Sequence, residues 1–168
     1  MARIAFVLGQ DFEDSEFRIP YDGLKATGHQ IEVIGVKPGA KMKGKEGKEE
    51  IAIERAAAEA DPAKYDALVI PGGYSPDHLR TDAAVVRFVD AMVKGDKLIA
   101  AVCHGPQLLI EADAVKGKTL TSWPSVRKDL ANAGARVVDE EVTVDGKLIT
   151  SRKPADLPAF TAAINQRL

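Results

Sequence analysis

Four short apolar runs set the strongest limit on how this chain can fold. A β-strand covered by helices on both faces needs a continuous apolar run, whereas a strand with one solvent-exposed face alternates apolar and polar residues. Apolar runs cover Ile4–Leu8, Ile31–Val36 (interrupted by Glu32), Ala67–Ile70 and Leu98–Val102, and each ends in or just before a glycine, a proline or a polar loop. The sequence therefore predicts four buried parallel strands.

Segments with helical spacing lie between and after these runs. They cover Glu13–Thr27, Ala83–Lys94, Pro106–Ala114, Ser125–Asn132 and Ala155–Leu168. Pro20 lies inside the first segment, so we expect that helix to bend or split. Near the end, Val142–Val144 and Lys147–Thr150 flank Asp145-Gly146, a dipeptide typical of a two-residue type I′ hairpin. This order predicts a flavodoxin-like three-layer α/β/α sandwich with a mostly parallel sheet and a late β-hairpin.

Size, charge and cysteine content narrow the class of protein. A length of 168 residues fits one domain, residues 1–168. The formal net charge of −2 provides no basic field, so we expect neither nucleic acid nor an anionic membrane as a partner. The single cysteine, Cys103, excludes an internal disulfide and a zinc site built from several thiolates. The first apolar run is too short for a secretion signal, and the cytoplasm is the expected location.

Residues 37–50 differ in composition from the rest of the chain. They contain five lysines, which suits a phosphate-binding patch, and three glutamates, which neutralise most of that charge. We favour a solvated hairpin or loop over the phosphate-binding patch.

Cys103 stands where a reactive group is expected. The strand Leu98–Val102 runs directly into Cys103, and His104, Gly105 and Pro106 follow at the start of a helix. This layout is typical of a nucleophile elbow, a tight strand-to-helix turn that lifts one side chain above the edge of the sheet. The helix start favours a thiolate and offers free N–H groups to an oxyanion. The alternative is a buried core cysteine, which the His-Gly-Pro sequence does not explain.

Three loops meet at the edge where Cys103 is expected, because the carboxyl ends of parallel strands lie together. Pro71-Gly72-Gly73 either brings free N–H groups to the site or is a plain tight turn. The acidic stretch Asp11–Glu16 either caps a helix or sends one carboxylate to the cysteine. His104 is the nearest base, His78 is its rival, and His29 looks like a surface turn residue.

The same residues carry a family resemblance that runs from about residue 2 to about residue 165. The motifs are Ala101–Gln107, Ile70–Gly73, Phe12–Glu16, Thr121–Pro124 and Ser151–Leu157. In these motifs the chain resembles the PfpI family of intracellular cysteine peptidases and stress proteins, within the class I glutamine amidotransferase-like superfamily.

The resemblance implies a role for particular residues. Cys103 would be the nucleophile, His104 its partner, and Glu13 the carboxyl group that hydrogen-bonds the cysteine. Gly73 and the backbone of His104 would form the oxyanion hole. The third carboxylate of the family's triad comes from a neighbouring subunit, and Asp77 occupies that position where some relatives carry glutamate. No metal and no cofactor is expected.

The implied function is hydrolytic, and the site would be completed in a homodimer or higher oligomer. Tyr74 and Leu79 give the loop around Asp77 apolar surface to bury, whereas the alternative is an exposed loop with Asp77 as a helix cap. Family members are described as peptidases, deglycases and glyoxalases, so peptides or small carbonyl compounds are the expected substrates. Amidotransferase chemistry is disfavoured, because it would need a glutamine site and a synthetase partner, and no second domain is expected here.

The alternative function is that of an oxidation-sensing or chaperone-like stress protein, in which Cys103 is a redox sensor and catalyses no reaction. Under either reading we expect Cys103 to have a depressed pKa and to oxidise readily to a sulfenic or sulfinic acid. We also expect Glu13 to hold a proton near neutral pH, with a raised pKa, because an ionised carboxylate beside the sulfur would disfavour the thiolate.

Overall fold

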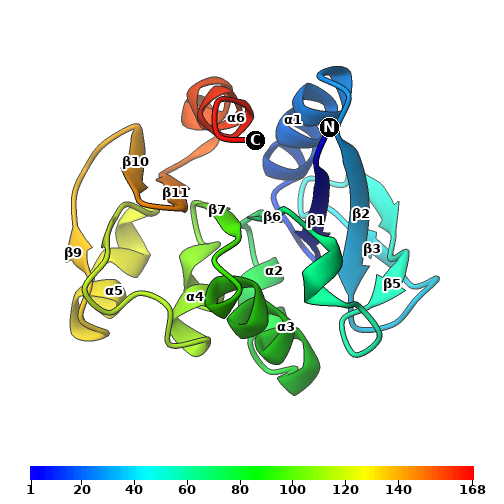
Figure 1. The fold of residues 1–168 in the computed structure, drawn as a ribbon, viewed down its shortest axis with the longest axis horizontal. Helices are drawn as coiled ribbons and strands as arrows, with labels where there is room; N and C mark the ends of the chain where they lie inside the picture. The colour runs from blue at the N-terminus through cyan, green and yellow to red at the C-terminus, as the bar shows by residue number, and fades with distance from the viewer.

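A central sheet of seven strands organises the computed structural model, which describes all residues, Met1–Leu168. Its strand order is β10-β11-β7-β6-β1-β2-β5 (Figure 1). The strands are β1 (Arg3–Val7), β2 (Gln30–Gly35), β5 (Arg55–Ala56), β6 (Ala67–Ile70), β7 (Leu98–Val102), β10 (Val142–Asp145) and β11 (Leu148–Ser151). Every neighbouring pair is parallel except β10 and β11. The four predicted strands and the late hairpin are confirmed.

Helices cover both faces of this sheet. They are α1 (Asp14–Ala26), α2 (Ser75–Leu79), α3 (Ala83–Lys94), α4 (Pro106–Glu111), α5 (Arg127–Asn132) and α6 (Leu157–Asn165), with short 3-10 turns at Pro62–Lys64, Pro124–Val126 and Pro154–Asp156. In Figure 1, α1 and α6 lie on one side of the sheet and α3, α4 and α5 on the other. The predicted three-layer α/β/α sandwich is therefore present.

The two helical layers explain the continuous apolar runs. In β1, Ala5 and Val7 belong to the hydrophobic cluster under α3 and α4, whereas Ile4 and Phe6 belong to the cluster under α1 and α6. Successive residues of a strand point to opposite faces, so a sheet that is buried on both sides needs apolar residues at every position.

Two local predictions need correction. The first helix is not split, because α1 continues through Pro20, and the alternative of a bend stays a prediction. Burial of its apolar face against α6 and the sheet outweighs the one hydrogen bond that proline removes. The hairpin turn consists of Gly146 and Lys147 rather than Asp145 and Gly146, since Asp145 pairs with Leu148 in the ladder. Only Gly146 has a positive φ, of 59°, whereas a type I′ turn needs two such residues.

The lysine-rich stretch forms an antiparallel hairpin, as favoured from its composition. Its strands are β3 (Lys41–Lys43) and β4 (Glu50–Ala52). The connecting loop is fastened to the start of α1, because the buried carboxylate of Asp14 accepts the N–H groups of Glu46, Lys48 and Glu49 at 2.8–2.9 Å.

In addition to the central sheet and the β3–β4 hairpin, there is a second two-stranded sheet, in which β8 (Thr119–Leu120) is parallel to β9 (Arg136–Val137). Across the whole chain, no helix combines the length and the apolar character needed to cross a membrane.

Candidate active site

Cys103 occupies the strand-to-helix turn that the sequence predicts. It follows the last residue of β7 and has φ of 62°, a left-handed conformation that non-glycine residues rarely adopt. Its N–H donates to the Ser151 carbonyl of β11 at 3.0 Å. A Cβ atom at Gly105 would lie 2.6 Å from the Ile70 carbonyl oxygen, so only glycine fits the turn before α4. The cysteine is buried, with 7% of its surface exposed.

His104, rather than His78, contacts the sulfur. The Cys103 Sγ lies 3.3 Å from His104 Nδ1. His78 instead lies beside Asp11, with Nε2 3.7 Å from its carboxylate, and His29 accepts the N–H of Ala2 at 3.0 Å. Burial lowers the pKa of His104, so the imidazole is neutral near pH 7.

The Gly-Gly loop packs directly against the cysteine turn. A Cβ at Gly72 would lie 2.6 Å from Glu16 Oε1 and 2.9 Å from the His104 nitrogen, so a side chain there would push the two loops apart. Gly73 has φ of 70°. The N–H groups of Gly73 and His104 donate to no other acceptor in the chain, and both lower the pKa of Cys103 by pointing at the sulfur.

The carboxyl group beside the sulfur belongs to Glu16, not to Glu13. Glu13 is the N-cap residue of α1, and its side chain is paired with Lys45 Nζ at 2.9 Å and accepts from the Ser15 hydroxyl at 3.2 Å. Glu16, one helical turn further on, is fully buried and its Oε1 accepts the Gly72 N–H at 3.0 Å. Its Oε2 is buried without a hydrogen-bond partner.

Burial raises the pKa values of both Glu16 and Cys103, so it favours the protonated form of each group. Burial, and secondly the charge of Glu13, raise the pKa of Glu16 to about 8. Burial, and secondly the charge of Glu16, raise the pKa of Cys103. The predicted depressed pKa of Cys103 is therefore wrong in direction, because desolvation outweighs the two backbone N–H groups. The carboxyl group with a raised pKa beside the sulfur is that of Glu16.

Two charged side chains approach the site from separate elements. Lys45, in the β3–β4 loop, lowers the pKa of His104, whereas Asp77 of α2 acts on it in the opposite direction. Asp77 makes no hydrogen bond to His104 within the chain, so a role for Asp77 stays a prediction. Leu79 is 1% exposed in its own core and gives no surface to a partner, whereas Tyr74 is 63% exposed.

Three residues of the site were not found from the sequence. Glu16 was within the acidic motif, but nothing in the motif told which carboxylate faces the sheet edge. Lys45 lies in the lysine-rich stretch and reaches the site only through the fold of the hairpin. Ser125 approaches His104 Nε2 at 3.3 Å from the 3-10 turn before α5, and no sequence signal marked it.

The rest of the molecule has no comparable cluster. A hollow of about 440 Å³ lies at the opposite edge of the sheet and is lined by Ala2, Asp66, Leu98 and Lys147 among others. No group of three or more His, Cys, Asp or Glu side chains is arranged to hold a metal ion.

An α/β/α sandwich with a cysteine on a strained turn, flanked by a histidine and a buried glutamate, defines a recognisable class of protein. Residues 2–167 match the sequence profile of the DJ-1/PfpI family. The chain belongs to this family, which confirms the resemblance.

Individual relatives cover nearly the whole chain. It is 46% identical over 168 residues to an uncharacterized Staphylococcus aureus protein, covering 99% of this chain and 98% of that one. It is 45% identical over 159 residues to protein/nucleic acid deglycase 2 of Escherichia coli, covering 94% of this chain and 92% of the relative. The crystal structure of a two-domain Anabaena variabilis protein with DJ-1/ThiJ/PfpI-like and ferritin-like domains matches with a TM-score of 0.98 and 46% identity. That match covers 99% of this chain and 48% of the Anabaena protein.

Proposed function

We propose that this protein is a cysteine-dependent hydrolase that acts on a carbonyl or amide carbon. The observation that carries the proposal is the Cys103 sulfur at 3.3 Å from His104 Nδ1, on a strained turn, with two unengaged N–H groups directed at it. A nucleophile, a base and an oxyanion site at one edge of the sheet are the parts that acyl transfer requires.

The reaction follows from these positions. His104 Nδ1 takes the thiol proton as the sulfur of Cys103 adds to the carbonyl carbon, and the carbonyl oxygen becomes an oxyanion held by the N–H groups of Gly73 and His104. When an amide is cleaved, the C–N bond breaks and the imidazolium returns its proton to the leaving nitrogen. Water then hydrolyses the thioester and restores the thiol.

The carboxyl groups have separate roles in this proposal. Protonated Glu16 places no negative charge beside the sulfur and can donate to it once the thiol is ionised. Glu13, paired with Lys45, adds its charge to the effect of burial in raising the pKa of Glu16. Asp77 of a second subunit would stabilise, by its negative charge, the imidazolium that forms on His104, which makes a homodimer or higher oligomer the working form.

The substrate class is proposed from the E. coli relative. That protein is named a protein/nucleic acid deglycase, so adducts of small carbonyl compounds on amines and thiols are the substrates that we favour, ahead of peptides. We further propose a stress-response role in the cytoplasm.

The test is a parallel assay with methylglyoxal, a glycated peptide, a glycated nucleotide and casein, comparing wild type with Cys103→Ala. We expect wild-type turnover of at least one carbonyl substrate and none by the variant. Equal rates for the two proteins on every substrate would contradict the proposal that the protein is a cysteine-dependent hydrolase.

The buried Glu16 supports a second candidate function, an oxidation sensor. Its unpartnered Oε2, when protonated, is a donor for an oxygen atom added to the sulfur. This candidate predicts that Cys103 is oxidised by peroxide while every substrate in the assay remains unchanged.

A further inference from the structure

His104 is held on three sides of its ring. Nδ1 faces the Cys103 sulfur at 3.3 Å, and Nε2 faces the Ser125 hydroxyl at 3.3 Å. The indole of Trp123 stacks on the ring at a centroid distance of 6.2 Å and an interplanar angle of 27°. Both nitrogens thus have a polar neighbour within one chain, and one short segment, residues 121–126, supplies two of the three contacts.

The segment that carries Ser125 is anchored on both sides. Before Ser125, the Thr121 N–H donates to the buried Thr150 hydroxyl at 2.9 Å, and the Trp123 N–H donates to the Cys103 carbonyl at 3.0 Å. After it, Val126 is 1% exposed and donates its N–H to the Trp123 carbonyl at 3.0 Å. The exposed serine therefore rests on a fixed backbone.

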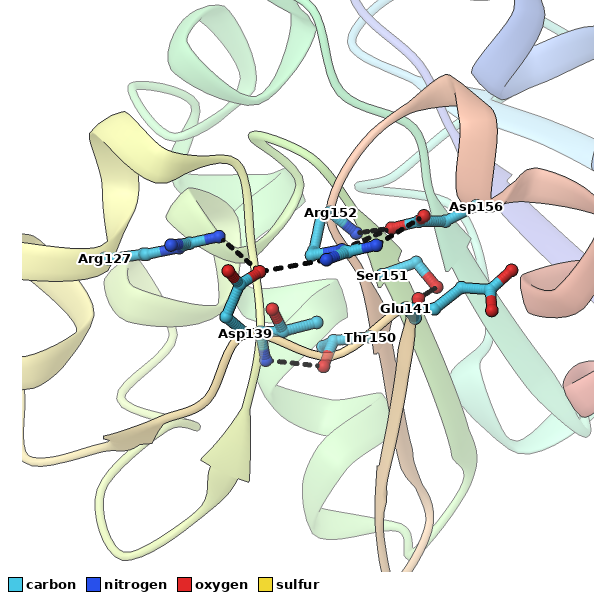
Figure 2. A network of polar contacts seen from close by, with 8 residues as sticks. Arg127, Asp139, Glu141, Thr150, Ser151, Arg152 and Asp156 are labelled. Atoms are coloured by element: carbon cyan, nitrogen blue, oxygen red, sulfur yellow. Dashed lines mark hydrogen bonds and ion pairs between the residues drawn. The ribbon is translucent and has the colours of Figure 1, made fainter.

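A network of ion pairs fastens the next residue, Arg127, to the end of β11 (Figure 2). Asp139 accepts hydrogen bonds from Arg127 at 2.9 Å and from Arg152 at 3.0 Å. The guanidinium of Arg152 also donates to the carboxylate of Asp156. Strand β11 also supplies the Ser151 carbonyl that accepts the Cys103 N–H. The network therefore connects the segment that carries Ser125 to the same strand that holds Cys103.

The two neighbours of His104 select one arrangement of protons. A neutral imidazole carries one proton, and a nitrogen that is to remove the thiol proton must be the bare one. Nδ1 faces the thiol, so the proton must lie on Nε2, where the serine hydroxyl can accept it. A hydroxyl also accepts from the imidazolium that forms next, so the contact survives the proton transfer.

We propose that Ser125 is a positioning residue, whose hydroxyl accepts the Nε2–H of His104 and so leaves Nδ1 free for the proton of Cys103. This inference rests on the proposed function, since it assigns the base of that reaction. Lys45 and Asp77 act on the same ring through their charges, from the β3–β4 loop and from α2, but neither makes a hydrogen bond to it.

The first test is spectroscopic and needs no turnover. With ¹⁵N-labelled histidine, the ring shifts of His104 report its tautomer, and His104→Gln assigns the signal among the three histidines. We expect the Nε2–H tautomer in the wild type and a mixture of tautomers in Ser125→Ala. Identical tautomer populations in the two proteins would overturn the proposal.

The second test is kinetic and uses a matched serine in the same segment. Ser125→Ala should lower kcat about tenfold with little change in KM, and Ser125→Thr should restore it. Ser122→Ala is the control, because its hydroxyl donates to the Trp123 carbonyl at 2.9 Å and does not contact His104. An unchanged kcat in Ser125→Ala, or an equal loss in Ser122→Ala, would contradict the proposal.

The two tests separate the proposal from the function on which it rests. If no substrate is turned over by the wild type, the proposed function fails, whereas the tautomer measurement still decides the role of Ser125.

Discussion

At the scale of single residues, the pairing of Glu16 with Cys103 is the least usual feature of the molecule. A carboxyl group and a thiol share one buried site, and burial opposes the charge of each. The pair therefore favours one proton on each group near neutral pH. Activation of the thiol then depends on His104 and on a proton remaining on Glu16, rather than on a lowered thiol pKa.

Replacing Glu16 by Gln should lower the pKa of Cys103. The amide keeps a donor beside the sulfur and removes the charge that raises the thiol pKa. Alkylation by iodoacetamide across pH 6–11 should therefore rise at lower pH in Glu16→Gln, with a rate about tenfold above wild type near pH 9, equivalent to about one pKa unit. Glu13→Gln is the comparison variant, with a smaller expected effect. Superimposable curves for wild type and Glu16→Gln would show that Glu16 does not control the thiol.

Glu16 should also make the fold less stable as pH rises. Its pKa is about 8 in the folded chain and near 4.5 when unfolded, so the unfolded state loses this proton first. Between those values the free energy of unfolding should fall by about 1.4 kcal/mol per pH unit from this group. Urea unfolding at pH 5, 7 and 9 should show the decline in wild type and a flatter profile in Glu16→Gln. Parallel profiles for the two proteins would contradict the raised pKa.

The choice between Glu13 and Glu16 shows the limit of sequence reasoning at this scale. Cys103, His104 and the Gly-Gly loop could be placed at one sheet edge because strand ends meet there. Which carboxylate faces the sulfur depends on where α1 begins. It also depends on Lys45, which comes from a hairpin distant in sequence and forms an ion pair with Glu13.

At the scale of elements, the polar network of Figure 2 joins α5 to β11 through links of unequal burial. The Asp156 side chain is 3% exposed and accepts from both the backbone and the guanidinium of Arg152, whereas the Asp139 side chain is 62% exposed. Only the buried carboxylate leaves unsatisfied donors behind when it is removed.

Asp156→Ala should therefore destabilise the protein by about 2 kcal/mol, through the lost charged hydrogen bonds of Arg152. Asp139→Ala should leave the free energy of unfolding within the scatter of the measurement, because exposed ion pairs are screened by solvent. Equilibrium unfolding in urea measures both variants. Equal effects of the two substitutions would show that burial does not govern this network.

The elements themselves were largely predictable from apolar patterning. Helix α3 matches its expected range of Ala83–Lys94, with Asp82 accepting the N–H groups of Ala84 and Val85 as a cap. Elements that depend on distant partners were not predictable. The short strands β8 and β9 and the Gly146-Lys147 turn are fixed by pairings that leave no periodic signal.

At the scale of the whole molecule, a second subunit would complete the site. Tyr74, at the start of α2, is a large exposed aromatic beside Asp77, and such a side chain is suited to burial in an interface. A two-fold dimer would place two equivalent copies of this helix at two sites.

Mixing two inactive variants tests this arrangement. Cys103→Ala and Asp77→Ala subunits should each be inactive alone and regain activity on exchange, because a mixed dimer contains one site with an intact cysteine and the partner's intact carboxylate. The expected recovery is about a quarter of wild-type activity for random pairing. No recovery, although exchange is seen by native mass spectrometry, would mean that Asp77 acts in its own chain or not at all.

The proposed reaction requires the Cys103 sulfur to bond to the carbonyl carbon of the substrate. Carbon-13 NMR with methylglyoxal labelled at the aldehyde carbon tests this most directly, because addition of sulfur converts a carbonyl or hydrate carbon into a sulfur-bound tetrahedral carbon. In wild type we predict a protein-bound resonance of that kind together with consumption of the label, and neither in Cys103→Ala. Consumption of the label by Cys103→Ala at the wild-type rate would contradict the account.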